Sequence, residues 1–194
     1  MRTVAKSVMK ICEDLEILQD FATKIQNKNH ENINGFKELK DLLFKIEKLD
    51  DKMFIQGGIF EEYIYWLIED NFDFDQVMFN VKIEFDFKVL NEFDVLMIKD
   101  NHLHVIECKL RKSVAGEDYV YKLDSVIDYL DDDGKGMILV IGGDNDRLTD
   151  SGNAKKSFSL GAKARARSAD ILIHHSKIFE KEIFLEDVRK HFLS

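Results

Sequence analysis

The chain has few of the residues that mark secreted or membrane proteins. Only two cysteines occur in its 194 residues, Cys12 and Cys108, and most of the chain separates them. No apolar run approaches the roughly 18 residues that a membrane-spanning helix needs. No basic stretch near the N-terminus leads into an apolar run of the signal-peptide kind. We therefore expect a soluble protein of the reducing cytoplasm, without a membrane partner.

Basic residues are outnumbered, since 28 lysines and arginines face 37 acidic residues and leave a formal net charge of -9. Taken alone, this excess argues against a nucleic-acid binder, because such affinity depends on cations that displace counterions. The basic residues are unevenly spread, however, and residues 154–169 contain no acid. That segment holds Lys155, Lys156, Lys163, Arg165 and Arg167. It is either a solvated helix face or a surface for a phosphate backbone.

Hydrophobic periodicity predicts one main domain behind a helical appendage. Residues 1–52 are expected to form two amphipathic helices, either as a docking element or as a helix-turn-helix reader. The main domain, residues 53–194, begins with a helix after Gly57 and Gly58. Its further order is three strands (77–87, 93–99, 102–109), a helix (117–130), a strand (137–141), a basic helix from about residue 154 and a strand (170–173). This order predicts an α/β fold, a mixed central sheet flanked by helices on both faces.

The second and third of these strands are close enough in sequence to form a hairpin. With Asp100 and Asn101 as a two-residue turn, Lys99 pairs with His102 and the register places Asp94 opposite Glu107. Side chains alternate along a strand, so Glu107 and Lys109 should share a face with Asp94. Cys108 should point the other way, as a small buried hydrophobe rather than a nucleophile.

Two opposed carboxylates repel each other across about 5 Å unless something neutralises them. A divalent cation does so, because Mg²⁺ takes oxygen ligands and leaves positions for water and a phosphate oxygen. Lys109 could then steady the attacking water or the charge that grows on the phosphate. Glu61, on the preceding helix, could add a ligand or hold a metal-bound water. A surface ion network is the alternative, but the neighbouring residues on both strands are apolar, and unpaired charge is costly in buried strands.

Three segments, GGIFE (57–61), NEFDVL (91–96) and IECK (106–109), resemble the signature of the PD-(D/E)xK nuclease superfamily over about residues 57–175. More narrowly, GGIFEEY, NEFDVL, NHLHVIECK, YKLDSV and ARARSADI resemble the nuclease domain of CRISPR-associated ancillary nucleases with a cyclic-oligoadenylate-sensing CARF domain. Phe93 replaces the proline of the superfamily name, and the chain contains no proline at all. That position varies in such nucleases and does no chemistry. The resemblance implies a restriction-endonuclease-like fold.

The resemblance also implies roles for individual residues. Asp94, Glu107 and the backbone carbonyl of Cys108 would hold Mg²⁺ or Mn²⁺, Lys109 would be the catalytic lysine, and Glu61 the helix acid. Within this interpretation, the basic side chains near the site would grip the phosphate backbone. These candidate nucleic-acid contacts are Arg111, Lys112, Lys122, Lys163, Arg165 and Arg167. Lys122 is either a second active-site cation or a solvated helix lysine.

The expected function is therefore metal-dependent hydrolysis of phosphodiester bonds in DNA and/or RNA, in prokaryotic defence of the CRISPR type. A homodimer is expected by analogy with the superfamily. The relatives carry a sensor domain ahead of the nuclease, which 50 helical residues cannot supply. We thus expect either a stand-alone nuclease or a domain whose sensor or activator lies outside this chain. The alternatives are a catalytically silent fold that binds nucleic acid or assembles with partners, and a junction resolvase.

Overall fold

The computed structural model describes residues 57–85, 89–110, 117–131, 133–141, 158–176 and 179–194. The predicted appendage, residues 1–52, lies outside the described residues, as do Arg111 and Lys112. The described elements, in chain order, are α5 (Ile59–Asn71), β1 (Gln76–Phe85), β2 (Val89–Lys99), β3 (His102–Leu110), α6 (Glu117–Leu130), β4 (Lys135–Ile141), α7 (Leu160–Ser168), β5 (Ile171–Ser176) and α8 (Lys181–Phe192). No described helix combines the length and apolarity needed to cross a membrane.

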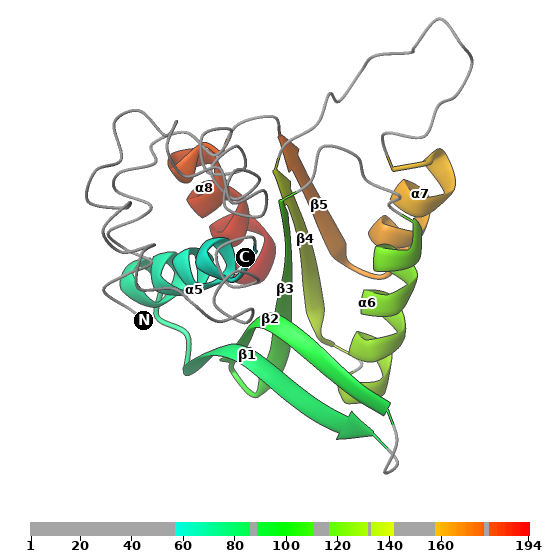
Figure 1. Cartoon of the computed structure of the whole chain (residues 1–194), viewed down its shortest axis with the longest axis horizontal. Coiled ribbons are helices and arrows are strands. Elements are labelled where there is room, and N and C mark those ends of the chain that lie inside the picture. The colour runs from blue at the N-terminus through cyan, green and yellow to red at the C-terminus, as the bar shows by residue number, and fades with distance from the viewer. Residues whose placement is uncertain (1–56, 86–88, 111–116, 132, 142–157, 177–178) are drawn as a thin grey trace, which may run out of the picture.

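The strands form one mixed sheet in the order β1-β2-β3-β4-β5. β1, β2 and β3 are antiparallel neighbours, whereas β4 and β5 run parallel to β3. The two parallel connections carry α6 and α7, which cover the same face of the sheet (Figure 1). That shared face is expected, because both crossovers step in one direction and crossovers are right-handed. α5 and α8 cover the other face, so the predicted α/β fold with helices on both sides is confirmed.

Each face of the sheet carries its own apolar layer. Phe60 and Ile64 of α5 and Phe184 of α8 pack with Val95 and Ile106 of the sheet. On the opposite face, α6 and α7 pack over residues that include Leu96, Val105, Ile138 and Val140. β4 is buried on both sides, because it lies between two parallel neighbours with helices above and below. The central strands are therefore packed on both faces.

The β2–β3 hairpin has the predicted turn. Asp100 and Asn101 have φ angles of 52° and 67°, which is the left-handed backbone that a type I′ turn requires at both central residues. The pairing runs as predicted from Lys99↔His102 to Val95↔Ile106. The turn therefore determines the register that the sequence suggested.

The side chains of β1 and β2 change from one face of the sheet to the other at Asn80 and Asp94. The register before and after this point is the same, with Phe79 opposite Val95 and Val81 opposite Phe93. Asn80 and Asp94 do not pair with each other, and Asn80 has φ 50°. Val95 faces α5, and the ring centroid of Phe79 lies 5.9 Å from that of Tyr65 on α5. Val81 and Phe93 instead pack with the α6–α7 layer. Asp94 thus occupies a break in the regular alternation of β2.

Two helical predictions need correction. The basic helix begins at Leu160, not near residue 154, because Ser159 Oγ accepts the Ala162 backbone N–H at 3.0 Å and caps the first turn. The C-terminal helix α8 was not predicted. Its buried residues Phe184, Leu185, Val188 and Phe192 have the spacing of one helical face.

Candidate active site

Asp94, Glu107 and Lys109 meet where β2 separates from β3, as predicted. Lys109 Nζ lies 2.6 Å from Glu107 Oε1 and 3.3 Å from Asp94 Oδ2. The expected direct pairing of Asp94 with Glu107 is wrong, because the described ladder ends at Val95↔Ile106. Asp94 Oδ2 instead accepts the backbone N–H of Cys108 at 2.7 Å. The carboxylate therefore fills the place of a backbone acceptor in the ladder.

The three charged groups are largely removed from solvent. Asp94 is 8% exposed, and burial together with the nearby Glu107 raises its pKa to about 6, although Lys109 and the Cys108 N–H act in the opposite direction. Burial lowers the pKa of Lys109, but Asp94 and Glu107 more than offset this and hold it above its usual value. Lys109 is consequently an ammonium shared by two carboxylates.

Cys108 lies on the opposite face of β3, with its side chain 3% exposed in the apolar layer under α5 and α8. Burial raises the pKa of its thiol well above the usual value. The thiol is therefore neutral at physiological pH and unsuited to nucleophilic attack. The prediction that Cys108 is a buried hydrophobe is confirmed.

Glu61 comes to the site from the first turn of α5, whereas Asp94, Glu107 and Lys109 come from β2 and β3. Burial raises its pKa to about 7, and the charges of Asp94, Glu107 and Glu92 add to this rise while Lys109 opposes it. Gly57 lies close by, since a Cβ there would meet Glu61 Oε1 at 3.3 Å. Glu61 therefore belongs to the same electrostatic cluster, as the helix acid was expected to.

The donor set suits a hard divalent cation. In the part of the chain that the structure describes, no three histidine, cysteine, aspartate or glutamate side chains are grouped closely enough to hold a metal by themselves. Mg²⁺, however, commonly uses only one or two protein carboxylates and fills its other positions with water or phosphate. Asp94 and Glu107, with Lys109 as their present counter-charge, provide two such carboxylates. The residues fit the predicted ion by donor type.

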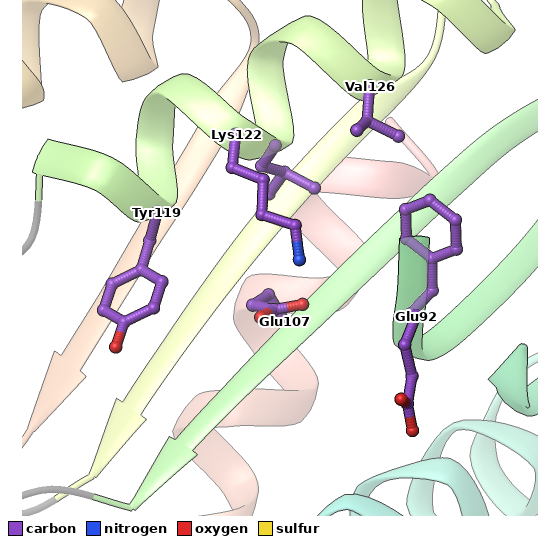
Figure 2. Close-up of a pocket in the computed structure, with 7 residues that line it drawn as sticks. Glu92, Glu107, Tyr119, Lys122 and Val126 are labelled. Carbon is purple, nitrogen blue, oxygen red and sulfur yellow. The ribbon is translucent and has the colours of Figure 1, made fainter. Parts of the chain in front are cut away.

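A pocket opens beside Glu107, on the α6 side of the sheet. The space in it, open solvent at its mouth included, is about 260 Å³, and its lining residues are Glu92, Phe93, Glu107, Tyr119, Lys122, Leu123 and Val126. Figure 2 shows the Lys122 side chain extending from α6 toward Glu107. Tyr119 lines the pocket from α6 as well, and its ring centroid lies 5.7 Å from Lys109 Nζ. The predicted residue Lys122 is thus brought to the candidate active site.

The basic helix α7 lies against α6. Lys163 and Arg167 are exposed on it, but Arg165 is engaged. Arg165 Nε donates to Asp124 Oδ2 at 2.5 Å, its Nη2 also pairs with that oxygen, and its guanidinium lies 5.8 Å from the Tyr121 ring centroid. Arg165 therefore joins α7 to α6, and the predicted phosphate contacts of all three residues stay predictions.

Two features of the site were missed from the sequence. Glu92 was not assigned a role, although it lines the pocket and contributes to the raised pKa of Glu61. Asp124 was also missed, yet it lies between Leu123 and Ile127 in the buried stripe of α6. A single carboxylate within an apolar stripe is a usable signal, because a buried charge needs a partner. No local pattern identifies that partner as Arg165.

Comparisons with known proteins identify the family and the fold of the chain. A model of the Card1-like endonuclease domain matches residues 49–149, which include Glu61, Asp94, Glu107 and Lys109. Can2 from Sulfobacillus thermosulfidooxidans, solved in complex with cyclic tetra-adenylate, aligns with a TM-score of 0.54 and 26% identity over 81% of this chain and 46% of its own. VC1899 from Vibrio cholerae aligns with a TM-score of 0.55 and 19% identity over 98% of this chain and 52% of its own, and supports the fold alone.

A search of curated proteins finds no match. The chain spans about half the length of Can2 and of VC1899. The family model nevertheless covers more than half of this chain, including α5 and the β2–β3 hairpin, which carry residues that resemble those of CRISPR-associated ancillary nucleases. The chain therefore belongs to the Card1-like endonuclease domain family, and the predicted kinship with restriction-endonuclease-like nucleases is confirmed.

Proposed function

We propose that this chain is a metal-dependent endonuclease that hydrolyses phosphodiester bonds in DNA and/or RNA. The observation that carries the proposal is the position of Lys109 between Asp94 and Glu107 in a largely buried site. Two carboxylates and a charged lysine in one place are costly to bury, and such clusters occur chiefly at functional sites. Membership of an endonuclease family supplies the reaction class.

In this proposal Asp94, Glu107 and the Cys108 backbone carbonyl hold Mg²⁺ or Mn²⁺. Such an ion, when bound, polarises the phosphate and lowers the pKa of a coordinated water. The Lys109 ammonium then stabilises negative charge that develops on the phosphate oxygens. Glu61, whose pKa is raised to about 7, can hold or release a proton near neutral pH beside the attacking water.

The biological setting that we propose is prokaryotic defence of the CRISPR type. Two observations support it: the family match, and the likeness to Can2, whose structure contains cyclic tetra-adenylate. Control of this chain by a cyclic oligoadenylate, through a sensor outside it, belongs to the same proposal, as does a homodimer. Both are testable together with the activity.

The test is cleavage of a panel of single- and double-stranded DNA and RNA and a branched DNA, with Mn²⁺, Mg²⁺ or EDTA, and with or without cyclic tetra-adenylate. The wild type is compared with Glu107→Gln and Lys109→Met. Glu182→Gln is a matched control, because Glu182 is an exposed acid on α8, away from the site. The mass of the chain in solution is measured on the same samples.

We expect cutting that needs the metal, is lost in both site variants and persists in the control. Cutting in EDTA, or undiminished cutting by Glu107→Gln, would contradict the proposal. Metal binding without any cutting would point to an activator outside this chain, and neither cutting nor metal binding would favour the catalytically silent alternative. A strong preference for the branched substrate would favour the junction resolvase.

A further inference from the structure

One face of α6 forms a wall of the pocket opposite Glu107. Tyr119, Lys122 and Val126 are spaced three and four residues apart, so their side chains project from the same side of the helix. All three line the pocket, together with Glu92 and Glu107 from the sheet. In Figure 2 the Lys122 side chain runs from this helix toward Glu107. The pocket therefore has an acidic side on the strands and a basic residue on α6.

Lys109 does not serve this pocket. Its ammonium lies 2.6 Å from Glu107 Oε1 and 3.3 Å from Asp94 Oδ2, and its side chain is only 16% exposed. Tyr119 packs beside it, with the ring centroid 5.7 Å from Nζ. Lys109 is therefore committed to the acidic cluster, and it is not among the residues that line the pocket. A phosphate that arrives at the pocket itself needs another cation.

Lys122 is placed for that role. It is exposed along α6, and its end reaches into the pocket beside Glu107. The salt bridges described around the site join Lys109 to its two carboxylates and Arg165 to Asp124, and none of them involves Lys122. A lysine ammonium carries three donors on a flexible stem, and it contacts phosphate as a point charge. Among the described residues, Lys122 is the basic side chain that lines the pocket.

We propose that Lys122 binds a backbone phosphate of the nucleic acid at the point where the strand enters the pocket beside Glu107. The inference rests on the proposed function, and it adds a substrate contact on α6 to a site otherwise built from strands and α5. It divides the two lysines by task. Lys109 acts within the acidic cluster on the phosphate that is cut, and Lys122 binds a phosphate at the pocket.

The test measures binding of a fluorescent oligonucleotide to the full chain in EDTA, over a series of salt concentrations, so that the result does not depend on cleavage. The variants are Lys122→Met, which removes the charge and keeps the length, and Lys122→Arg. Lys181→Met is the control, because Lys181 is an exposed lysine on α8 across the sheet. Each variant is first checked for an unchanged melting temperature.

We expect Lys122→Met to weaken binding roughly five- to tenfold near 0.1 M salt, which is what one lost phosphate contact and its counterion amount to. The slope of log affinity against log salt should become shallower by about one. Lys122→Arg should restore most of the binding, and Lys181→Met should behave as the wild type. Wild-type binding by Lys122→Met, or no binding by the wild-type chain, would overturn the inference.

A second comparison separates a phosphate contact from a purely structural neutralisation of Glu107. Lys122→Met is combined with Glu107→Gln, and the binding loss is compared with that of the single variant. A phosphate contact predicts the same loss in both backgrounds. A loss that vanishes when Glu107 is neutral would refute the contact. Cleavage and metal binding by the wild type decide the proposed function separately. Cutting together with wild-type binding by Lys122→Met rejects only this inference, and binding through Lys122 with neither cutting nor metal binding rejects only the nuclease.

Discussion

Asp94 and Cys108 are joined by a 2.7 Å hydrogen bond in which the Cys108 backbone N–H donates to the Asp94 carboxylate. A side chain of β2 thus satisfies an amide of β3 at the point where the ladder between these strands ends. The same carboxylate oxygen lies 3.3 Å from Lys109 Nζ. Asp94 therefore has a structural task and a proposed catalytic task, and substitutions can separate them.

Asp94→Asn should abolish metal-dependent cutting but not folding. An asparagine oxygen can still accept the Cys108 N–H, and the variant removes a buried charge whose pKa is already raised to about 6. Asp94→Ala instead leaves the amide without that acceptor, at a cost of about 1–3 kcal/mol. Urea unfolding in EDTA should rank Asp94→Asn at or above the wild type and Asp94→Ala below both. Equal losses in the two variants would contradict the hydrogen-bonding role.

Glu61 should make the metal-free protein more stable as the pH falls. Its pKa in the folded chain is raised to about 7, so the folded state takes up a proton that the unfolded state, near 4.5, does not yet bind. This contribution grows as the pH falls through about 7 and is complete below about 4.5. In EDTA, the unfolding free energy of the wild type minus that of Glu61→Gln should rise as the pH falls from about 8 to about 5. A flat difference would contradict the raised pKa.

Protons and the proposed cation should compete at this site. Asp94, a proposed ligand, has a pKa raised to about 6 and must lose its proton to bind the cation. Glu61 lies in the same cluster with a pKa raised to about 7, and its charge attracts the cation only when it is ionised. Mn²⁺ affinity measured by calorimetry should therefore fall from about pH 8 to pH 6, with protons released on binding. Repeating the titration in buffers of different ionisation enthalpy counts those protons. Affinity independent of pH, with no proton release, would argue against a metal at these carboxylates.

His104 should make the protein less stable as the pH falls, which is opposite to the effect of Glu61. Burial lowers its pKa to about 4, with Lys135, His102 and His191 adding to the effect and Asp131 opposing it, and its Nδ1 accepts the Lys135 backbone N–H at 3.3 Å. The unfolded chain binds a proton near pH 6.5, so stability present above that pH is lost as the pH falls toward 4. The loss should reach roughly 2 kcal/mol at about pH 5.

His104→Asn keeps an acceptor near the Nδ1 position but does not titrate, and its stability should depend less on pH over this window. Chemical unfolding at about pH 7.5 and pH 5 measures the effect. Identical slopes for the wild type and His104→Asn would show that another group is responsible.

Arg165→Met should destabilise the fold, because it leaves the 3%-exposed Asp124 without its partner. Since the Arg165 side chain is itself half exposed, we expect roughly 2 kcal/mol, less than for a fully buried pair. Lys163→Met and Arg167→Met change exposed residues of the same helix and should leave the melting temperature within about 1 °C. Thermal unfolding of the three variants makes the comparison. A neutral Arg165→Met would mean that the ion pair is not needed to join α6 and α7.

Local chemistry determined much of this protein before any tertiary contact was known. The Asp100–Asn101 turn follows from the ability of these residues to adopt positive φ, and it fixes the register of the hairpin. Alternation along β3 then separates Glu107 and Lys109 from Cys108. These features depend on neighbours in sequence, and the gathering of the charged trio could therefore be predicted.

The tertiary structure decided what depends on distant residues. The break at Asn80 turns Asp94 out of the regular pleat and toward the Cys108 amide, and alternation alone had placed it directly opposite Glu107. The direction of Lys122 and the partner of Asp124 follow from how α6 and α7 pack, because a helical pattern indicates which face is buried but not what covers it. The sequence by itself therefore determined which chemical groups the site contains, and packing between remote elements decided where each of them points.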